Sequence, residues 1–264
     1  MIKHYLKVAF RNLIKYKTQS LVSIIGLAVG FTCFALSVLW IRYEMTYDNF
    51  HEGADRIYLV RAHYANEPGT SKFTPYPLMK YLQDKMPEIE AVTAFTAHYV
   101  KFRMEDTEQE IGMIAADSVF MNFFDIQLLK GTVNFLKCDG QEVAITKEFA
   151  KRLFSKEEDA LGKEVEVGRR VCKIGAIVSG WSNHSNIPYN ILAPARHSPQ
   201  WGSSNEQLLI RVRERTDIDA FRTKMSTVCI NDIEKESELS DLLITRMSAL
   251  RYSDYVDKLS LIHI

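Results

Sequence analysis

The chain has 264 residues, 47% of them hydrophobic and 25% charged, and its 33 basic residues balance its 33 acidic ones. The balance is uneven, because residues 1–20 hold five of the basic residues and no acid, which leaves 28 basic and 33 acidic residues beyond them. An acidic remainder does not suit a nucleic-acid surface, so nucleic acid is excluded as a partner.

Residues 2–17 have the spacing of an amphipathic helix. Lys3, Lys7, Arg11 and Lys15 recur at every fourth position, and apolar residues form a stripe at helical spacing. A basic amphipathic helix ahead of a membrane span is typical of a segment at the inner leaflet, where anionic headgroups attract it. We therefore predict that these four side chains form a cytoplasmic basic face.

Residues 21–41 contain no charge. As a helix they would span about 31 Å, close to the roughly 30 Å hydrocarbon core of a bilayer, and hydroxyls such as those of Thr32 and Ser37 can bond to helix carbonyls. A transmembrane helix is predicted, in preference to a buried core helix or a cleaved signal peptide, whose apolar region is usually shorter. Gly26 and Gly30 form a small-xxx-small step, which predicts packing against another membrane helix.

The flanks of this span give its orientation. Basic residues precede it, whereas residues 42–56 hold four acids and two arginines. Positive charge stays on the cytoplasmic side, so the N-terminus is predicted inside and residues 42–264 outside. Trp40, Tyr43 and Tyr47 then suit the outer interface.

Two strand–helix–strand units are predicted in the remaining sequence, one near its start and one near its end. The first has strands at 56–64 and 89–95 around a helix at 76–85, and the second has strands at 207–212 and 241–247 around a helix at 217–234. Such separated halves indicate a split ferredoxin-like subdomain, and the fold class is α+β.

Residues 98–196, between these units, have a β-rich pattern. Strands are predicted at 100–105, 110–116 and 142–146, and a β-hairpin at 164–178. Asp117 and Thr146 stand where they can cap short helices. Phe120, Phe123 and Phe124 are interpreted as core aromatics, with the lining of a ligand pocket as the alternative.

The sequence has no motif that indicates an enzyme. It lacks a phosphate loop and a nucleophile elbow, and the stretch at His51-Glu52 lacks the second histidine of a zinc-protease motif. His184 is interpreted as part of a solvated turn. Cys138, Cys172 and Cys229 fit no metal spacing, and a long-range disulfide between two of them stays open. No catalytic residue, metal site or cofactor is predicted.

A series of short motifs runs along nearly the whole chain. It consists of Phe10-Arg11-Asn12-Leu13, Gly26 to Gly30, Tyr47-Asp48-Asn49-Phe50-His51, Asp55-Arg56-Ile57-Tyr58, Pro87-Glu88-Ile89, Asp117 to Phe124 with Gly131, Ala144-Ile145-Thr146 through Phe154, Leu161-Gly162-Lys163 and Gly175-Ala176-Ile177. In this order the motifs resemble the permease subunits of MacB/FtsX-like ATP-binding cassette transporters, over the first span and the MacB-like periplasmic core domain.

The resemblance implies a fold and a set of boundaries. The span is followed by an ectodomain with a split ferredoxin-like (porter) lobe and an inserted β-rich (sabre) lobe. The boundaries are then 1–20 for the cytoplasmic amphipathic helix, 21–41 for the transmembrane helix, 42–97 and 197–258 for the porter-like lobe, 98–196 for the sabre-like lobe, and 259–264 for a truncated end. The end is expected to be truncated because the family has three further spans after the ectodomain.

The resemblance also implies a function without catalysis. The chain is expected to be a permease subunit, or a fragment of one, in the bacterial inner membrane, where it couples ATP hydrolysis by a separate cytoplasmic ATP-binding subunit to shape changes of a periplasmic domain. Export or extraction of a substrate would follow. The partners implied are the lipid bilayer, the ATPase and a second permease in a homodimer or heterodimer, and a periplasmic or outer-membrane partner stays open. The alternative is a single-span anchored ligand-binding or sensor ectodomain.

Overall fold

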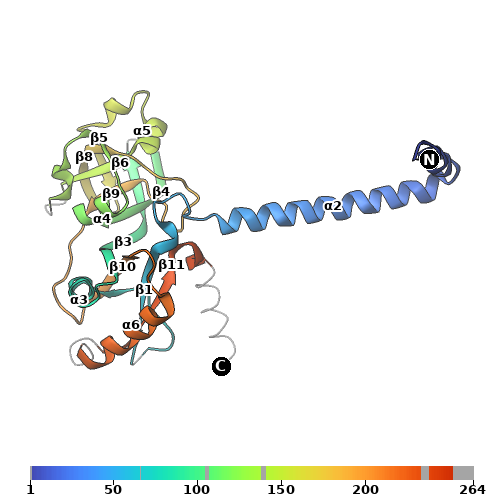
Figure 1. The fold of residues 1–264 in the computed structure, drawn as a ribbon. Helices are drawn as coiled ribbons and strands as arrows, with labels where there is room; N and C mark the ends of the chain where they lie inside the picture. Colours follow the sequence, from blue (N-terminus) through green and yellow to red (C-terminus); the bar gives the residue numbers. More distant parts are fainter. Residues whose placement is uncertain (1, 66, 105–106, 138–140, 233–237, 252–264) are drawn as a thin grey trace. The chain divides into compact units, whose positions relative to one another are not determined.

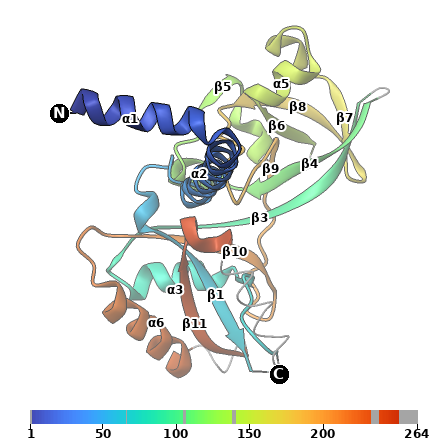
Figure 2. The same cartoon turned by 90° about the vertical axis from the view of Figure 1, so that its right-hand side faces the viewer.

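The computed structural model describes residues 2–65, 67–104, 107–137, 141–232 and 238–251, so the predicted end at 259–264 lies outside the described residues. The chain forms two compact units, Met1–Tyr47 and Asp48–Ile264. The first unit contains helices only, and the second contains all of the described strands (Figures 1 and 2).

Two helices form the first unit. They are α1 (Ile2–Lys15) and α2 (Lys17–Met45), and α2 is the one described helix long and apolar enough to cross a membrane. Within α2 the Thr32 hydroxyl donates to the Ala28 carbonyl at 2.8 Å, and the Ser37 hydroxyl donates to the Cys33 carbonyl at 2.8 Å, as predicted. The helix continues through residues 42–45, beyond the predicted end of the span at residue 41.

The second unit contains a four-stranded antiparallel sheet, called here the first sheet. Its order is β11 (Leu239–Arg246), β1 (Ile57–Tyr64), β10 (Ser204–Val212) and residues 89–95 of β3 (Ile89–Met104). If these strands are numbered along the chain, the spatial order is 4-1-3-2, as expected for β-α-β-β-α-β ferredoxin-like units.

Helices α3 (Pro77–Lys85) and α6 (Ile218–Asp232) cover one face of the first sheet (Figure 2). Leu78 and Leu82 of α3 and Phe221 and Met225 of α6 are buried with Val60 of β1. Both helices were predicted from this apolar spacing. Asp217 precedes α6, and its carboxylate accepts hydrogen bonds from the Asp219 and Ala220 amides.

A second sheet continues from the same long strand. Residues 96–104 of β3 pair with β4 (Thr107–Ala116), and the order then runs through β9 (Ile191–Pro194), β6 (Glu142–Thr146), β8 (Arg170–Val178) and β5 (Leu128–Gly131). The pairs β4–β9 and β6–β8 are parallel. The boundary predicted after residue 97 therefore lies inside one continuous strand.

Short elements complete the second unit. The remaining strands are β2 (Thr74–Pro75) and β7 (Glu164–Val167), the α-helices are α4 (Ser118–Phe123) and α5 (Lys147–Leu153), and the 3-10 helices are η1 (Ala54–Arg56), η2 (Val133–Leu136), η3 (Glu157–Ala160) and η4 (Met247–Ala249). Asp117 caps α4 and Thr146 caps α5, as predicted. The hairpin β7–β8 also forms as predicted.

The two sheets share a core. Ile57 and Leu59 point from β1 to the face opposite α3 and α6, where they pack with Phe120 and Phe123 of α4 and with Leu192 of β9. Alternate residues of β1 are thus buried on both faces, which explains the continuous apolar run at residues 57–60. The second sheet has another core around Phe102 and Phe149.

Candidate functional site

Asp48, the first residue of the second unit, is fully buried and has a left-handed backbone with φ of 58°. Its carboxylate accepts a hydrogen bond from the Ser185 hydroxyl. It also accepts bonds from the backbone amide and side-chain amide of Asn186, at 3.0 and 2.6 Å. The Asp48 amide donates to the His184 carbonyl at 3.2 Å. The loop before β9 therefore holds the residue that opens the domain.

Asn186 also contacts the other end of the domain. Its side-chain amide donates to the Met247 carbonyl at 3.3 Å, and Met247 follows the last strand, β11. We call Asp48, Ser185, Asn186 and Met247 the Asp48 clasp. One loop of the clasp thus bonds both to the residue that begins the domain and to the residue that follows its final described strand.

The bonding of the clasp suits a structural role better than a catalytic or metal-binding one. Burial raises the pKa of Asp48, and hydrogen bonds from Ser185 and Asn186 lower it without cancelling that effect. Both carboxylate oxygens accept from protein donors, which leaves them poorly placed for metal binding or proton transfer. Among the residues that the structure describes, no group of three or more His, Cys, Asp or Glu could hold a metal ion.

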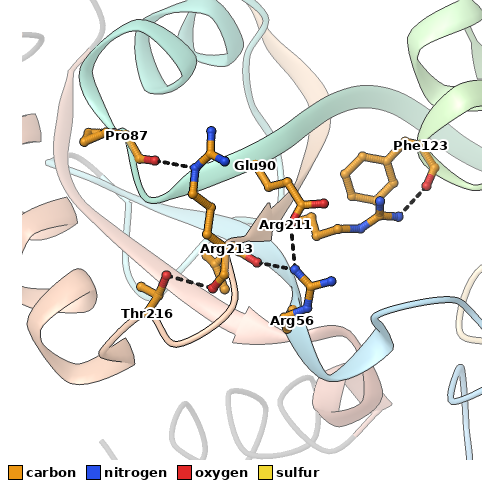
Figure 3. Close-up of polar contacts among 8 residues, drawn as sticks. Arg56, Pro87, Glu90, Phe123, Arg211, Arg213 and Thr216 are labelled. Carbon is orange, nitrogen blue, oxygen red and sulfur yellow. Dashed lines mark hydrogen bonds and ion pairs between the residues drawn. The ribbon is translucent and has the colours of Figure 1, made fainter.

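The segment that follows Asp48 is fixed at its far end by Arg56 of η1. The Arg56 guanidinium pairs with Glu90 at 2.6 Å and donates to the Val212 carbonyl at 3.0 Å (Figure 3). Beside it the Arg213 Nε donates to the Pro87 carbonyl at 2.9 Å. Residues 48–56 are therefore bonded at one end to the loop at 184–186 and at the other to the first sheet.

A second polar cluster lies in the connection from β9 to β10. His197 Nδ1 lies 3.2 Å from Glu206 Oε1, and His197 Nε2 lies 3.8 Å from Asp117 Oδ2. The His197 ring stacks on Tyr76 with ring centroids 4.1 Å apart. Burial alone lowers the pKa of His197, but the two carboxylates outweigh it and raise the pKa to about 9. A charged imidazolium therefore joins Asp117, ahead of α4, to Glu206 of the first sheet.

A cavity of about 510 Å³ lies next to the clasp. It is lined by Phe50, His51, Phe124, Trp181 and Arg211, among others. Phe120 and Phe123 are core residues, as interpreted from the sequence, while Phe123 and Phe124 also line this cavity. Phe123 therefore belongs to both the core and the cavity wall, and the binding of a ligand there stays a prediction.

The residues predicted from the sequence as functional lie in the first unit. Lys7, Arg11 and Lys15 are exposed on α1, and the side chain of Lys3 lies outside the described residues. A Cβ added at Gly26 or Gly30 would meet nothing within 4 Å, so α2 leaves open space beside both. The basic face and the glycine packing step stay predictions.

Sequence reasoning missed the Asp48 clasp. Asp48 entered only as one of the four acids after the span and as part of the stretch Tyr47 to His51, and the loop at 183–186 was interpreted as a solvated turn. His184 does lie in a loop, but it is half-buried and its carbonyl is bonded to Asp48. Cys172 is buried in β8, whereas Cys138 and the side chain of Cys229 lie outside the described residues, so the disulfide question stays open.

These features define a class of protein. An apolar N-terminal helix is followed within a few residues by a mixed α/β domain, whose ferredoxin-like sheet is split by a β-rich insertion. The chain belongs to the MacB-like periplasmic core domain family, whose model matches residues 20–228. This family is the permease component of ABC-type transporters and not their ATPase. No curated protein matches the chain.

Solved structures share the fold. A domain of a protein described as a permease from Porphyromonas gingivalis is 19% identical with a TM-score of 0.57, and the match covers 74% of this chain and 92% of that one. The extracellular domain of the ABC-type transporter YknZ from Gram-positive bacteria is 14% identical with a TM-score of 0.52, and the match covers 72% of this chain and 99% of that one. The periplasmic region of MacB from Actinobacillus actinomycetemcomitans is 12% identical with a TM-score of 0.51, and the match covers 76% of this chain and 94% of that one. The predicted family and fold class are confirmed.

Proposed function

We propose that the chain is a permease subunit, or part of one, that couples ATP hydrolysis by a separate cytoplasmic subunit to shape changes of a periplasmic domain. Export or extraction of a substrate would result. The observation that carries the proposal is the match of the family model to residues 20–228, because one family region then includes most of the apolar helix and most of the α/β domain. The expected orientation has the N-terminus in the cytoplasm of the bacterial cell and Asp48–Ile264 in the periplasm.

The Asp48 clasp supports transmission of movement from the helix to the domain. Only Thr46 and Tyr47 separate the end of α2 from Asp48, and a stretch of that length reaches at most about 11 Å. A longer flexible linker would absorb a displacement of the helix. A buried, multiply bonded residue immediately after the helix instead passes the displacement to the loop at 184–186.

Other parts of the proposal concern the boundaries and the first unit. We assign 42–97 and 197–258 to a porter-like lobe and 98–196 to a sabre-like lobe. The basic face of Lys3, Lys7, Arg11 and Lys15 is assigned to the inner leaflet and the ATPase, and Gly26 with Gly30 to packing against a second permease. Cysteine crosslinking in membranes would test the packing, because leucine at both glycines should abolish a crosslink formed along α2.

The second candidate function is a single-span anchored domain that binds a ligand. The cavity beside His51 favours it, because its volume lies within the range of small-molecule sites. The two candidates differ in whether an ATP-binding subunit acts on the domain.

The test uses the full-length protein reconstituted in nanodiscs with an ATP-binding subunit encoded beside its gene. Spin labels at exposed Lys85 and Arg169, one in each sheet region, report distances within the domain. We expect ATP to change that distance, and we expect Asp48→Asn to reduce the change while ATP hydrolysis continues. Failure of any ATP-binding subunit to associate, or an unchanged distance, would refute coupling and leave the anchored binding domain.

A further inference from the structure

The cavity next to the Asp48 clasp has a fixed aromatic wall. The His51 ring lies 4.2 Å from Phe50, 4.7 Å from Phe124 and 4.9 Å from Trp181, measured between ring centroids. Trp181 is held in place because its Nε1 donates to the Ile187 carbonyl at 3.0 Å. The wall thus offers a continuous surface of packed rings, one of which is held by a hydrogen bond.

The same cavity contains a guanidinium without an acidic partner. One terminal nitrogen of Arg211 donates to the Phe123 carbonyl at 2.6 Å, and the guanidinium lies 4.7 Å from the Phe123 ring centroid. Figure 3 shows Arg211 directed toward Phe123, away from the Arg56–Glu90 pair. No carboxylate in the described part of the chain lies within ion-pair distance of Arg211, although Glu52 and Asp125 contribute to the exposed lining.

Two buried side-chain nitrogens, each from a residue that lines the cavity, have no hydrogen-bond partner among the described residues. They are Arg211 Nε and His51 Nε2. A buried donor without an acceptor typically costs about 1–3 kcal/mol, so such atoms call for a partner from outside the chain. The acceptor that best suits a guanidinium is a phosphate or carboxylate, which can take two parallel hydrogen bonds.

We propose that this cavity binds a phosphate or carboxylate group carried on an apolar body, with the anion at Arg211 and His51 and the apolar part against Phe50, Phe124 and Trp181. The position of His51, soon after the predicted membrane span, favours an amphiphile from the membrane as the molecule that carries this anionic group. His51 is ten positions after Ile41, the end of the predicted span, and a stretch of that length reaches at most about 36 Å. The proposal goes beyond coupling to an ATPase and does not depend on it.

The test titrates the full chain, in neutral detergent micelles, with short-chain phosphatidylglycerol, short-chain phosphatidylcholine and inorganic phosphate. Trp40 and Trp201 are replaced by phenylalanine, so that the fluorescence comes from Trp181 in the cavity wall. We expect phosphatidylglycerol to bind about tenfold more tightly than either other probe, which corresponds to about 1.4 kcal/mol. This selectivity is measured on the chain with Arg211 intact, so it does not depend on a variant that folds poorly.

Two arginine variants locate the site. Arg211→Gln should weaken phosphatidylglycerol binding about tenfold. Arg213→Gln, two positions along the chain and bonded to Pro87 instead, should leave it unchanged. Equal binding of inorganic phosphate would overturn the membrane source in favour of a free anion. Equal binding of the two lipids, or equal losses in the two variants, would overturn the anion site itself, and neither result bears on ATP-driven coupling.

Discussion

The Asp48 clasp and the cavity at His51 lie within three positions of each other in the sequence, yet their polar groups are satisfied differently. In the clasp every carboxylate oxygen of Asp48 accepts from Ser185 or Asn186. In the cavity, His51 Nε2 and Arg211 Nε have no partner in the described part of the chain. A polar cluster whose groups bond to one another stabilises the fold, whereas buried nitrogens without a partner leave room for a ligand.

The largest expected effect comes from breaking the clasp. Asp48→Asn keeps the size and tolerates the left-handed backbone, but it places an amide NH₂ opposite the donors of Ser185 and Asn186. We expect the free energy of unfolding of the second unit to fall by about 3 kcal/mol, because buried donors lose a charged acceptor. Urea unfolding followed by tryptophan fluorescence measures the change.

The matched control is Asp125→Asn. Asp125 also has a left-handed backbone, with φ of 50°, but its side chain is exposed. Its substitution should change the free energy of unfolding by less than about 0.5 kcal/mol. Similar losses in the two variants would show that backbone conformation, and not the buried bonds, accounts for the effect at Asp48.

The charged cluster at His197, where the imidazole lies between Asp117 and Glu206, should give the next largest effect. The pKa of His197 is raised to about 9, against an ordinary value of 6.5, because its two carboxylates outweigh burial. The contribution of a charged His197 to the free energy of unfolding is therefore fully present below about pH 6.5 and is lost as the pH rises through 9. We expect His197→Gln to lower the free energy of unfolding by about 2 kcal/mol at pH 7 and to remove much of the loss between pH 7 and 10.

Unfolding curves at several pH values compare His197→Gln with the unsubstituted chain. The two stability profiles should converge as the pH approaches 10. Parallel profiles across this range would show that Asp117 and Glu206 do not hold a charged His197.

Local patterns in the sequence predicted most of the first sheet, because its elements carry their own signals. The helix at 76–85 shows apolar residues at helical spacing and ends before Pro87, and α6 begins after the capping residue Asp217. The strand β9 was missed for the opposite reason. Its four residues end at Pro194, and it is a strand because β4 and β6 lie on either side of it. Such pairing depends on contacts far apart in the chain.

The candidate site was less accessible to prediction. Asp48 and Asn186 are 138 positions apart, and nothing in a single sequence links an acid that follows an apolar helix to an amide in a polar loop. The stretch from Tyr47 to His51 carried family resemblance but gave no physical role. Buried polar pairs of this kind are specified by tertiary packing, which also explains why His184 is half-buried instead of solvated.

The smallest expected effect is a pH dependence at His51, opposite in sign to that at His197. Burial first, and the nearby Arg211 second, lower the pKa of His51 to about 4. The part of the free energy of unfolding that depends on a neutral His51 is thus fully present above about pH 6.5 and is lost as the pH falls toward 4. Because the ring is partly exposed, we expect this loss to be about 1 kcal/mol, and His51→Phe should remove it while keeping an aromatic ring in the wall. An anion bound beside His51 would stabilise the imidazolium, so short-chain phosphatidylglycerol should also reduce the acid loss in the unsubstituted chain. An acid loss that His51→Phe leaves unchanged would place its origin elsewhere in the domain.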